Sequence, residues 1–234
     1  MTDMRRILVL DGSAAGESAY GLAACVEHKA GRYTLLSCSK VAGKQAAEGI
    51  AGLAHHALDD AGWSKEAETA PHCVAVVVGP GSFTGLRASC AVAAGYALGL
   101  GVPVTGVTRG EALRPALEQT IREHSEQPLQ GWLLVTAARK GRVFIETTEG
   151  VQAVSLADWI PPSGVWLVAG DAVSLLPAMP EGEVSTLAMP DAEQIAQVAL
   201  ARLNGYLPPR DALPVYVDPP EAKRPAGGLR SAPV

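Results

Sequence analysis

Apolar runs of strand length alternate with polar turns in the first part of the chain and predict a sheet. Residues 7–10, 20–27 and 33–39 form three such runs, and Ala30-Gly31-Arg32 supplies a hairpin turn between the second and the third. We expect an antiparallel start to the fold. Residues 73–78 are continuously apolar, which is typical of a strand buried in a parallel sheet.

Two helices are predicted on either side of this buried strand. Before the strand, apolar residues recur at three- and four-residue spacing over residues 46–61, and Gly62 ends the pattern. After the strand, residues 85–98 predict a helix that has almost no polar face. Residues 102–107 then predict a further strand.

The second half of the chain loosely repeats this pattern without a sequence repeat. Residues 132–136 and 143–148 predict a hairpin closed by Lys140-Gly141-Arg142, and residues 166–169 predict a buried strand. Asp191 is expected to cap a helix that runs through residue 203.

The order of the first elements, strand-strand-strand-helix-strand-helix-strand, is that of the first lobe of the actin-like, sugar-kinase and Hsp70 superfamily. The expected fold class is therefore α/β, a two-lobed actin-like/Hsp70-like ATPase (ASKHA) fold in which each lobe is a mixed sheet with helices. We predict a first lobe over residues 1–106, a second lobe over residues 107–217 and a flexible proline-rich tail over residues 218–234.

Composition and charge narrow the function classes. The formal charge is -5 and there are no runs of Lys or Arg, which disfavours binding of nucleic acid by this chain alone. The cysteines are widely spaced and form no Cys-x-x-Cys pair, so reduced thiols are expected rather than a zinc site. The start of the chain does not resemble a secretory signal, and residues 88–100 are too short to span a bilayer. We expect a cytoplasmic protein without membrane contact.

The most specific motif is a run of nine residues between the buried strand and the apolar helix. It reads Gly79-Pro80-Gly81-Ser82-Phe83-Thr84-Gly85-Leu86-Arg87. Its glycines permit a sharp turn from strand to helix, and Ser82 or Thr84 is expected to cap the helix. The N–H groups of such a turn suit an anion or a carbonyl-rich partner surface, whereas a turn without a ligand is the alternative. It is not a Walker phosphate loop, because no Lys-Ser/Thr pair follows the glycines.

This run resembles the signature of the bacterial TsaB (YeaZ) family, which takes part in making N6-threonylcarbamoyladenosine in tRNA. Similarity extends to residues 7–13, 79–100 and 139–143 and to Pro214-Val215-Tyr216, but the chain departs from the family pattern at Val217-Asp218. The resemblance implies a non-catalytic subunit that pairs through first-lobe helices with its catalytic paralogue TsaD. It also implies the ATPase TsaE as a partner and contact with tRNA indirectly, through the complex.

A vestigial nucleotide site is the second candidate. Asp11 and Ser13 follow the first strand, where actin-like folds place a carboxylate and backbone amides at phosphates, although a polar cap on the strand turn is an equal alternative. In the second lobe, Ala137-Ala138-Arg139 stands where many TsaB-like sequences carry Asp-Ala-Arg. Ala137 has no ligand atom, so phosphoryl transfer using both lobes is disfavoured. Arg139 is either an anion contact or a solvated hairpin tip. No cofactor is certain; ATP or ADP at the interface with the partner is the candidate.

No catalytic residue and no metal site is predicted. His55 and His56 are adjacent, so they point to different sides of a helix and do not form a metal-binding pair at helical spacing. Ser82 lacks the Gly-x-Ser-x-Gly context of a nucleophilic serine.

The two helices of the first lobe carry more apolar surface than one sheet covers, which favours a partner interface. The alternative is that the two helices pack only on each other. The interface residues that we predict are Ile50, Ala54, Ala91, Ala94 and Leu98. A homodimer through this surface is expected when the partner is absent.

Three functions from different classes are thus compared. The preferred one is a non-catalytic scaffold or activator of a tRNA threonylcarbamoyltransferase complex, with no activity alone. The alternative is an ATP-dependent phosphotransferase or ATPase of actin-like fold, supported by residues 11–13 and weakened by Ala137. A metallopeptidase is the least supported, because the metal-binding residues are lacking.

Overall fold

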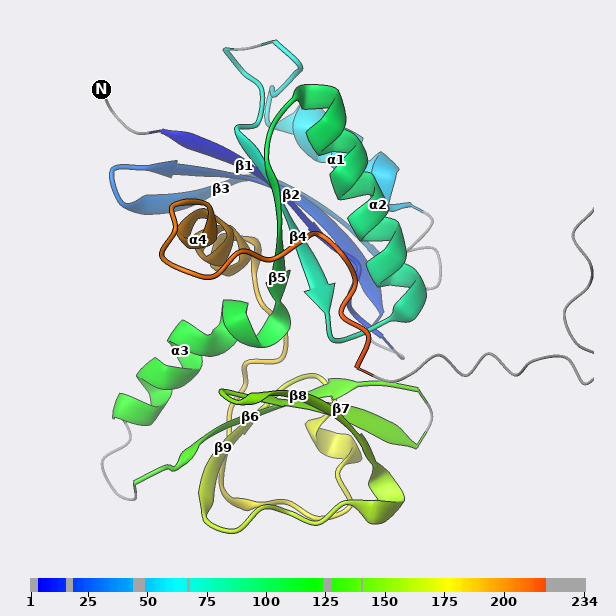
Figure 1. Ribbon diagram of the computed structural model, residues 1–234, viewed down its shortest axis with the longest axis vertical. Coiled ribbons are helices and arrows are strands. Elements are labelled where there is room, and N and C mark those ends of the chain that lie inside the picture. Colours follow the sequence, from blue (N-terminus) through cyan, green and yellow to red (C-terminus); the bar gives the residue numbers. More distant parts are fainter. Residues whose placement is uncertain are drawn as a thin grey trace, which may run out of the picture.

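The computed structural model describes residues 4–15, 19–43, 49–66, 68–123, 128–139 and 141–217. These residues form two lobes, each built on a five-stranded sheet (Figure 1). The two-lobed α/β fold predicted from the sequence is confirmed.

The first sheet has the strand order β3-β2-β1-β4-β5. Strands β1 (Arg5–Asp11), β2 (Tyr20–Lys29) and β3 (Arg32–Ala42) pair antiparallel, whereas β4 (Cys73–Gly79) and β5 (Val104–Thr108) continue the sheet parallel to β1. Strand β4 lies between two parallel neighbours and is buried along its whole length, which explains its unbroken apolar sequence.

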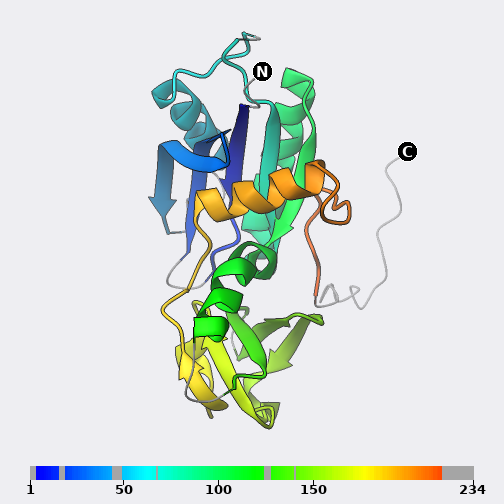
Figure 2. The same ribbon diagram turned by 90° about the vertical axis from the view of Figure 1, so that its left-hand side faces the viewer.

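Helices cover both faces of the first sheet. Helices α1 (Ile50–Asp60) and α2 (Phe83–Leu100) pack on one face, against side chains such as Leu8 and Leu10. Helix α4 (Ala192–Leu203) crosses the other face and packs against side chains such as Ile7 and Val9 (Figure 2). Successive residues of β1 therefore face two separate cores.

The second sheet has the strand order β10-β9-β6-β7-β8. Its strands are β6 (Gly131–Ala137), β7 (Arg142–Thr147), β8 (Gly150–Ser155), β9 (Val165–Ala169) and β10 (Glu181–Val184). Two short 3₁₀ helices, η3 (Leu156–Asp158) and η4 (Val173–Leu175), lie between strands. Helix α3 (Arg109–Glu123) directly follows β5, and Leu113 and Leu117 pack with Trp132 and Leu134 of this lobe.

The predicted lobe boundaries differ from the packing in one respect. We predicted that residues 107–217 form the second lobe, but α4 contributes Ile195 and Ala199 to the core of the first lobe. The segment after α4 also returns to the first sheet, where the Val215 N–H donates to the Val78 carbonyl (2.8 Å). The reason is that β1 and its neighbours have a second apolar face, which α4 covers.

Some predicted and observed elements do not coincide. Helix α3 and strands β8 and β10 were not predicted: Pro115 interrupts the α3 pattern, and β10 is short and largely polar. The predicted helix start at residue 46 and the tail over 218–234 lie outside the described residues. Within the described ranges, no helix is long and apolar enough to cross a membrane.

Candidate functional site

The nine-residue turn packs directly against the loop that follows β1. A methyl group on Gly85 would lie 1.9 Å from the Gly12 carbonyl oxygen, and one on Gly81 would lie 2.0 Å from the Ser13 carbonyl oxygen. Real side chains do not approach backbone so closely, so these glycines let two backbone segments touch. The Gly79–Pro80 peptide bond at the start of the turn is cis.

The N–H groups at the start of α2 are partly used within the chain. Ser82 is the N-cap, one of the two residues predicted for that role, and its hydroxyl accepts the Gly85 N–H (3.3 Å). The Ser82 N–H donates to the Ser13 carbonyl (2.9 Å). These bonds hold the turn in place without an external ligand, so anion binding remains a secondary interpretation.

The exposed end of the turn forms a cluster with the C-terminal segment. The rings of Phe83 and Tyr216 lie 5.5 Å apart, and each residue is 53% exposed. The Arg87 guanidinium lies over the Phe83 ring at 4.5 Å, and its Nε donates to the Tyr216 hydroxyl (3.1 Å). The first lobe thus binds residues near the end of the described chain, a contact that sequence spacing did not predict.

Asp11 and Ser13 are buried rather than open to a cleft. They are 1% and 0% exposed, and the Ser13 N–H donates to Asp11 Oδ1 (2.7 Å). Burial raises the pKa of Asp11, although this hydrogen bond and the nearby charge of Arg109 act to lower it. Asp11 Oδ2 and Ser13 Oγ have no hydrogen-bond partner among the described residues.

A buried arginine stands in the same region. The Arg109 side chain is 0% exposed, and its Nη2 lies 3.0 Å from Oδ2 of Asp171, whose side chain is 5% exposed. Asp171 Oδ1 in turn accepts the Ala137 N–H (3.1 Å). A carboxylate therefore lies beside Ala137 after all, supplied by the segment after β9, but it is paired with an internal cation.

The residues between the lobes do not fit a nucleotide with its metal ion. Asp11, Ser13 and Thr136 have unpartnered buried oxygens, but they are closed to solvent and the guanidinium of Arg109 lies in the same region. Arg139, the third residue of the predicted vestigial site, is exposed, whereas Asp11 and Ser13 are buried. We derive no chemical step from this cluster.

The predicted interface residues divide into two groups. Ile50 (2% exposed) and Ala54 (0% exposed) pack inside the first lobe, so their assignment to the interface was wrong: this side of α1 covers the sheet. Ala91 and Ala94 are exposed, and Leu98 is 87% exposed.

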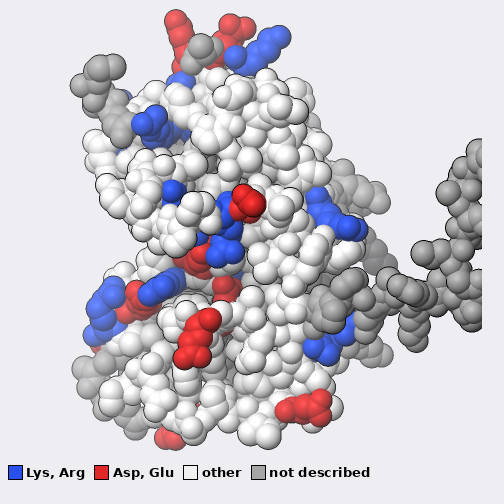
Figure 3. All heavy atoms as spheres, in the orientation of Figure 1, with Lys and Arg blue, Asp and Glu red and all other residues white. Residues whose placement is uncertain are grey.

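An open apolar groove lies between α1 and α2. It has a volume of about 380 Å³ and is lined by Ala51, Val92, Gly95, Tyr96, Gly99 and Leu100. Together with Ala91, Ala94 and Leu98, these residues form what we call the α1/α2 surface. In the view of Figure 3, charged side chains gather at the waist between the lobes, whereas few lie over α2.

The described histidines and cysteines form no obvious reactive site. His55 pairs with Asp59 on exposed helix positions (3.3 Å), and no group of three His, Cys, Asp or Glu in the described part of the chain is placed to hold a metal ion. Cys25, Cys73 and Cys90 are buried and Cys38 is exposed, all as free thiols. Burial raises the pKa of Cys25 to about 11 and of Cys73 to about 12, so both stay protonated at neutral pH.

Sequence reasoning did not find Arg109, Asp171 or Glu146. Their partners come from distant segments, and nothing in the local sequence marks a buried ion pair. One local signal marks the start of α3, the helix that Arg109 opens: Thr108 and Glu111 form a capping box. The Thr108 N–H donates to Glu111 Oε2 (2.8 Å), and the Glu111 N–H donates to Thr108 Oγ1 (3.1 Å).

Comparisons with known proteins agree on a family and a fold. A family model described as TsaD: tRNA N6-adenosine threonylcarbamoyltransferase matches residues 39–156, half of the chain. The uncharacterized protein Rv3421c of Mycobacterium tuberculosis is 31% identical over 159 residues, which span 64% of this chain and 65% of that protein. A similar match is found to the uncharacterized protein Mb3455c of Mycobacterium bovis.

Two solved structures share the fold. YeaZ from Pseudomonas aeruginosa superposes with a TM-score of 0.63 at 23% identity, covering 91% of this chain and 99% of YeaZ. An uncharacterized protein with similarity to peptidase YEAZ from the same organism superposes with a TM-score of 0.64 at 22% identity, covering 92% of this chain and 100% of that one. The resemblance drawn from the nine-residue turn agrees with both kinds of comparison.

Proposed function

We propose a function from the premise that this chain belongs to the family of TsaD, tRNA N6-adenosine threonylcarbamoyltransferase, within which it has the fold of YeaZ. It acts in tRNA modification as a non-catalytic scaffold or activator subunit, which pairs with a TsaD-type catalytic subunit that forms N6-threonylcarbamoyladenosine. An ATPase of the TsaE type and tRNA join through the complex. Any nucleotide that the assembly uses lies at the contact between subunits.

The α1/α2 surface is the observation that carries this proposal. Leu98 is 87% exposed on a helix whose other outward residues include Ala91 and Ala94, so apolar side chains face solvent where a polar helix face is usual. A methyl group added to Gly95 or Gly99 would meet no atom within 4 Å, so a partner helix has room to approach the α2 backbone closely.

The interior supports a role without catalysis. Asp11, Ser13 and Arg109, which lie between the lobes, are buried, and Arg109 and Asp171 neutralise each other. A catalytic acid or base must reach its substrate, and these groups do not reach solvent. The chemistry of the family is therefore assigned to the partner subunit.

The test is binding to a TsaD-type subunit followed by reconstitution of tRNA modification. Ala94→Arg places a charge in the α1/α2 surface and should weaken co-elution with that subunit at least about tenfold, because desolvating an unpaired charge in an apolar interface is costly. Ala178→Arg, an exposed position in the second lobe, is the matched control and should bind normally. Normal binding by a folded Ala94→Arg variant would contradict the proposed surface.

The same preparations separate the scaffold from the ATPase alternative. The isolated chain should not turn over ATP with Mg²⁺, and tRNA modification should require both subunits. Robust turnover by the chain alone, lost in Asp11→Asn, would refute the scaffold proposal. Without the catalytic subunit, we expect the α1/α2 surface to pair two copies of this chain, which light scattering measures.

A further inference from the structure

Both connections between the lobes meet at one side chain. The chain enters the second lobe between Thr108, the last residue of β5, and Arg109, the first of α3. It returns after β10, where Leu187 packs in the core of the second lobe and Met189 packs in that of the first. Figure 2 shows the two connections side by side between the lobes.

Arg109 contacts the return connection as well as the segment that follows β9 in the second lobe. Its Nη2 donates to the Ala188 carbonyl (3.3 Å) and to Met189 Sδ, and lies 3.0 Å from Asp171 Oδ2. Its charge also acts on the buried Asp11 at the end of β1. One guanidinium thus joins the outgoing connection, the return connection and a carboxylate of the second lobe.

Glu146 of β7 holds the outgoing connection from the other lobe. Its Oε1 accepts the Thr108 hydroxyl (2.7 Å), and its Oε2 accepts the Gly110 N–H (2.9 Å) at the start of α3. A methyl group on Gly110 would lie within 2.3 Å of this carboxyl group, so a side chain at this position would displace Glu146 from its present contacts. Burial raises the pKa of Glu146, whereas its hydrogen bonds with Thr108 and Gly110 act to lower this pKa.

The outgoing connection is also fixed on the side of the first lobe. Glu111 Oε1 accepts from Arg202 Nη2 (2.6 Å) and from Arg210 Nη2 (3.0 Å). Arg202 is 3% exposed and donates further to the Gly106 carbonyl (2.6 Å). Each residue from Thr108 to Glu111 is therefore bonded to a segment that is distant in the sequence.

We propose that Arg109, with Asp171 and Glu146, is an internal clamp that holds the two lobes in one fixed arrangement without a ligand. A nucleotide between the lobes would need to displace a fully buried cation from its carboxylate, and the lobes would need to separate to admit it. The two-lobed fold is thus used as a rigid body. This inference rests on the fold and the contacts, independently of the proposed partner.

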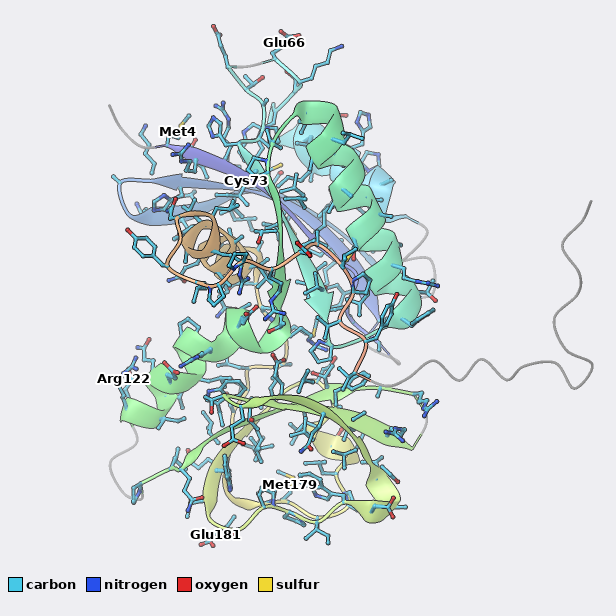
Figure 4. The ribbon with its side chains drawn as sticks, in the orientation of Figure 1. Met4, Glu66, Cys73, Arg122, Met179 and Glu181 are labelled. Atoms are coloured by element: carbon cyan, nitrogen blue, oxygen red, sulfur yellow. The ribbon has the colours of Figure 1, made fainter. Side chains whose placement is uncertain are left out.

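The test measures the distance between the lobes by double electron–electron resonance between two spin labels. One spin label is placed on the exposed native Cys38 of β3 and the other on Glu181→Cys in β10; Figure 4 shows Glu181 at the far end of the second lobe. The three other cysteines are buried. The parent protein should give one narrow distance distribution, unchanged by Mg²⁺ and ATP.

Arg109→Met should broaden this distribution about twofold or shift its maximum, because the lobes then rotate about the two connections. Arg114→Met, which removes an exposed arginine from the same helix, is the matched control and should leave it unchanged. If Arg109→Met does not fold, the double variant Arg109→Met/Asp171→Asn, which also neutralises the buried carboxylate that Arg109 pairs with, is measured in its place and is expected to give the same result.

Two results would overturn the clamp. One is a distribution that stays as narrow as the parent's in a folded Arg109 variant. The other is a parent distribution that is already broad, or that narrows or shifts when Mg²⁺ and ATP are added. The co-elution experiment on Ala94→Arg reads out a different surface, so failure of the clamp and failure of the proposed function are distinguishable.

Discussion

Replacing Gly85 by alanine tests whether the glycines of the nine-residue turn serve a backbone contact. The new methyl group would lie 1.9 Å from the Gly12 carbonyl oxygen, and both atoms belong to segments fixed by hydrogen bonds. The closest contact is with backbone, so no flexible side chain can move aside to make room for the methyl group. Overpacking of this kind costs about 1–3 kcal/mol and occasionally more, so we expect a net loss of stability of about 1 kcal/mol after the gain in helix propensity.

Gly95→Ala in the same helix is the matched control. Its new methyl group would have nothing within 4 Å, so only helix propensity changes and the protein should gain about 0.8–1.0 kcal/mol. Urea unfolding of both variants gives the two free energies at an unchanged slope m. A Gly85→Ala protein as stable as Gly95→Ala would refute the close-contact explanation and return the turn to an anion-binding role.

Two further predictions concern polar contacts of the first lobe. Burial, followed by the charge of Arg6, lowers the pKa of His72 from 6.5, so the folded state holds this proton less tightly than the unfolded state does. The contribution of neutral His72 to the free energy of unfolding is therefore complete above about pH 6.5 and falls as the pH drops below it. His72→Asn should reduce the dependence of the free energy of unfolding on pH, measured by urea titrations at several pH values. Arg202→Met should lower the free energy of unfolding by about 3 kcal/mol, because it removes a buried arginine from its ion pair with Glu111. The Arg210 side chain is 35% exposed, so Arg210→Met should lower it by less than about 1 kcal/mol in the same assay.

The strands and helices with a clear apolar period were predictable from the sequence. Strand β4 is apolar because it lies between two parallel strands and under helices on both faces, and α4 begins at Asp191 with a capping box completed by Gln194. Both features are local, so the sequence pattern reports them directly. The family resemblance likewise depended on consecutive residues of one turn.

The unpredicted contacts of Arg109 and Arg202 join segments that are far apart in the chain. Only the tertiary fold brings Arg109 to Asp171 and Arg202 to Gly106 and Glu111. The error at Ile50 and Ala54 has a related cause: helix α1 has apolar residues on several sides, and only the position of the sheet decides which side is buried. Periodicity alone does not distinguish a buried small residue from an exposed one.

The distribution of charge between inside and outside links the two proposals. Arg109 and Asp171 pair with each other inside the protein, whereas the first lobe exposes apolar residues such as Leu98. Association costs less free energy when the binding surface is already rigid, because fewer motions are lost in the complex. Helices α1 and α2 rest on the sheet whose strand β5 leads into the clamp at Thr108 and Arg109. A clamp that fixes the lobes would therefore fix the orientation of the second lobe relative to the α1/α2 surface, and with it the geometry of any complex formed there.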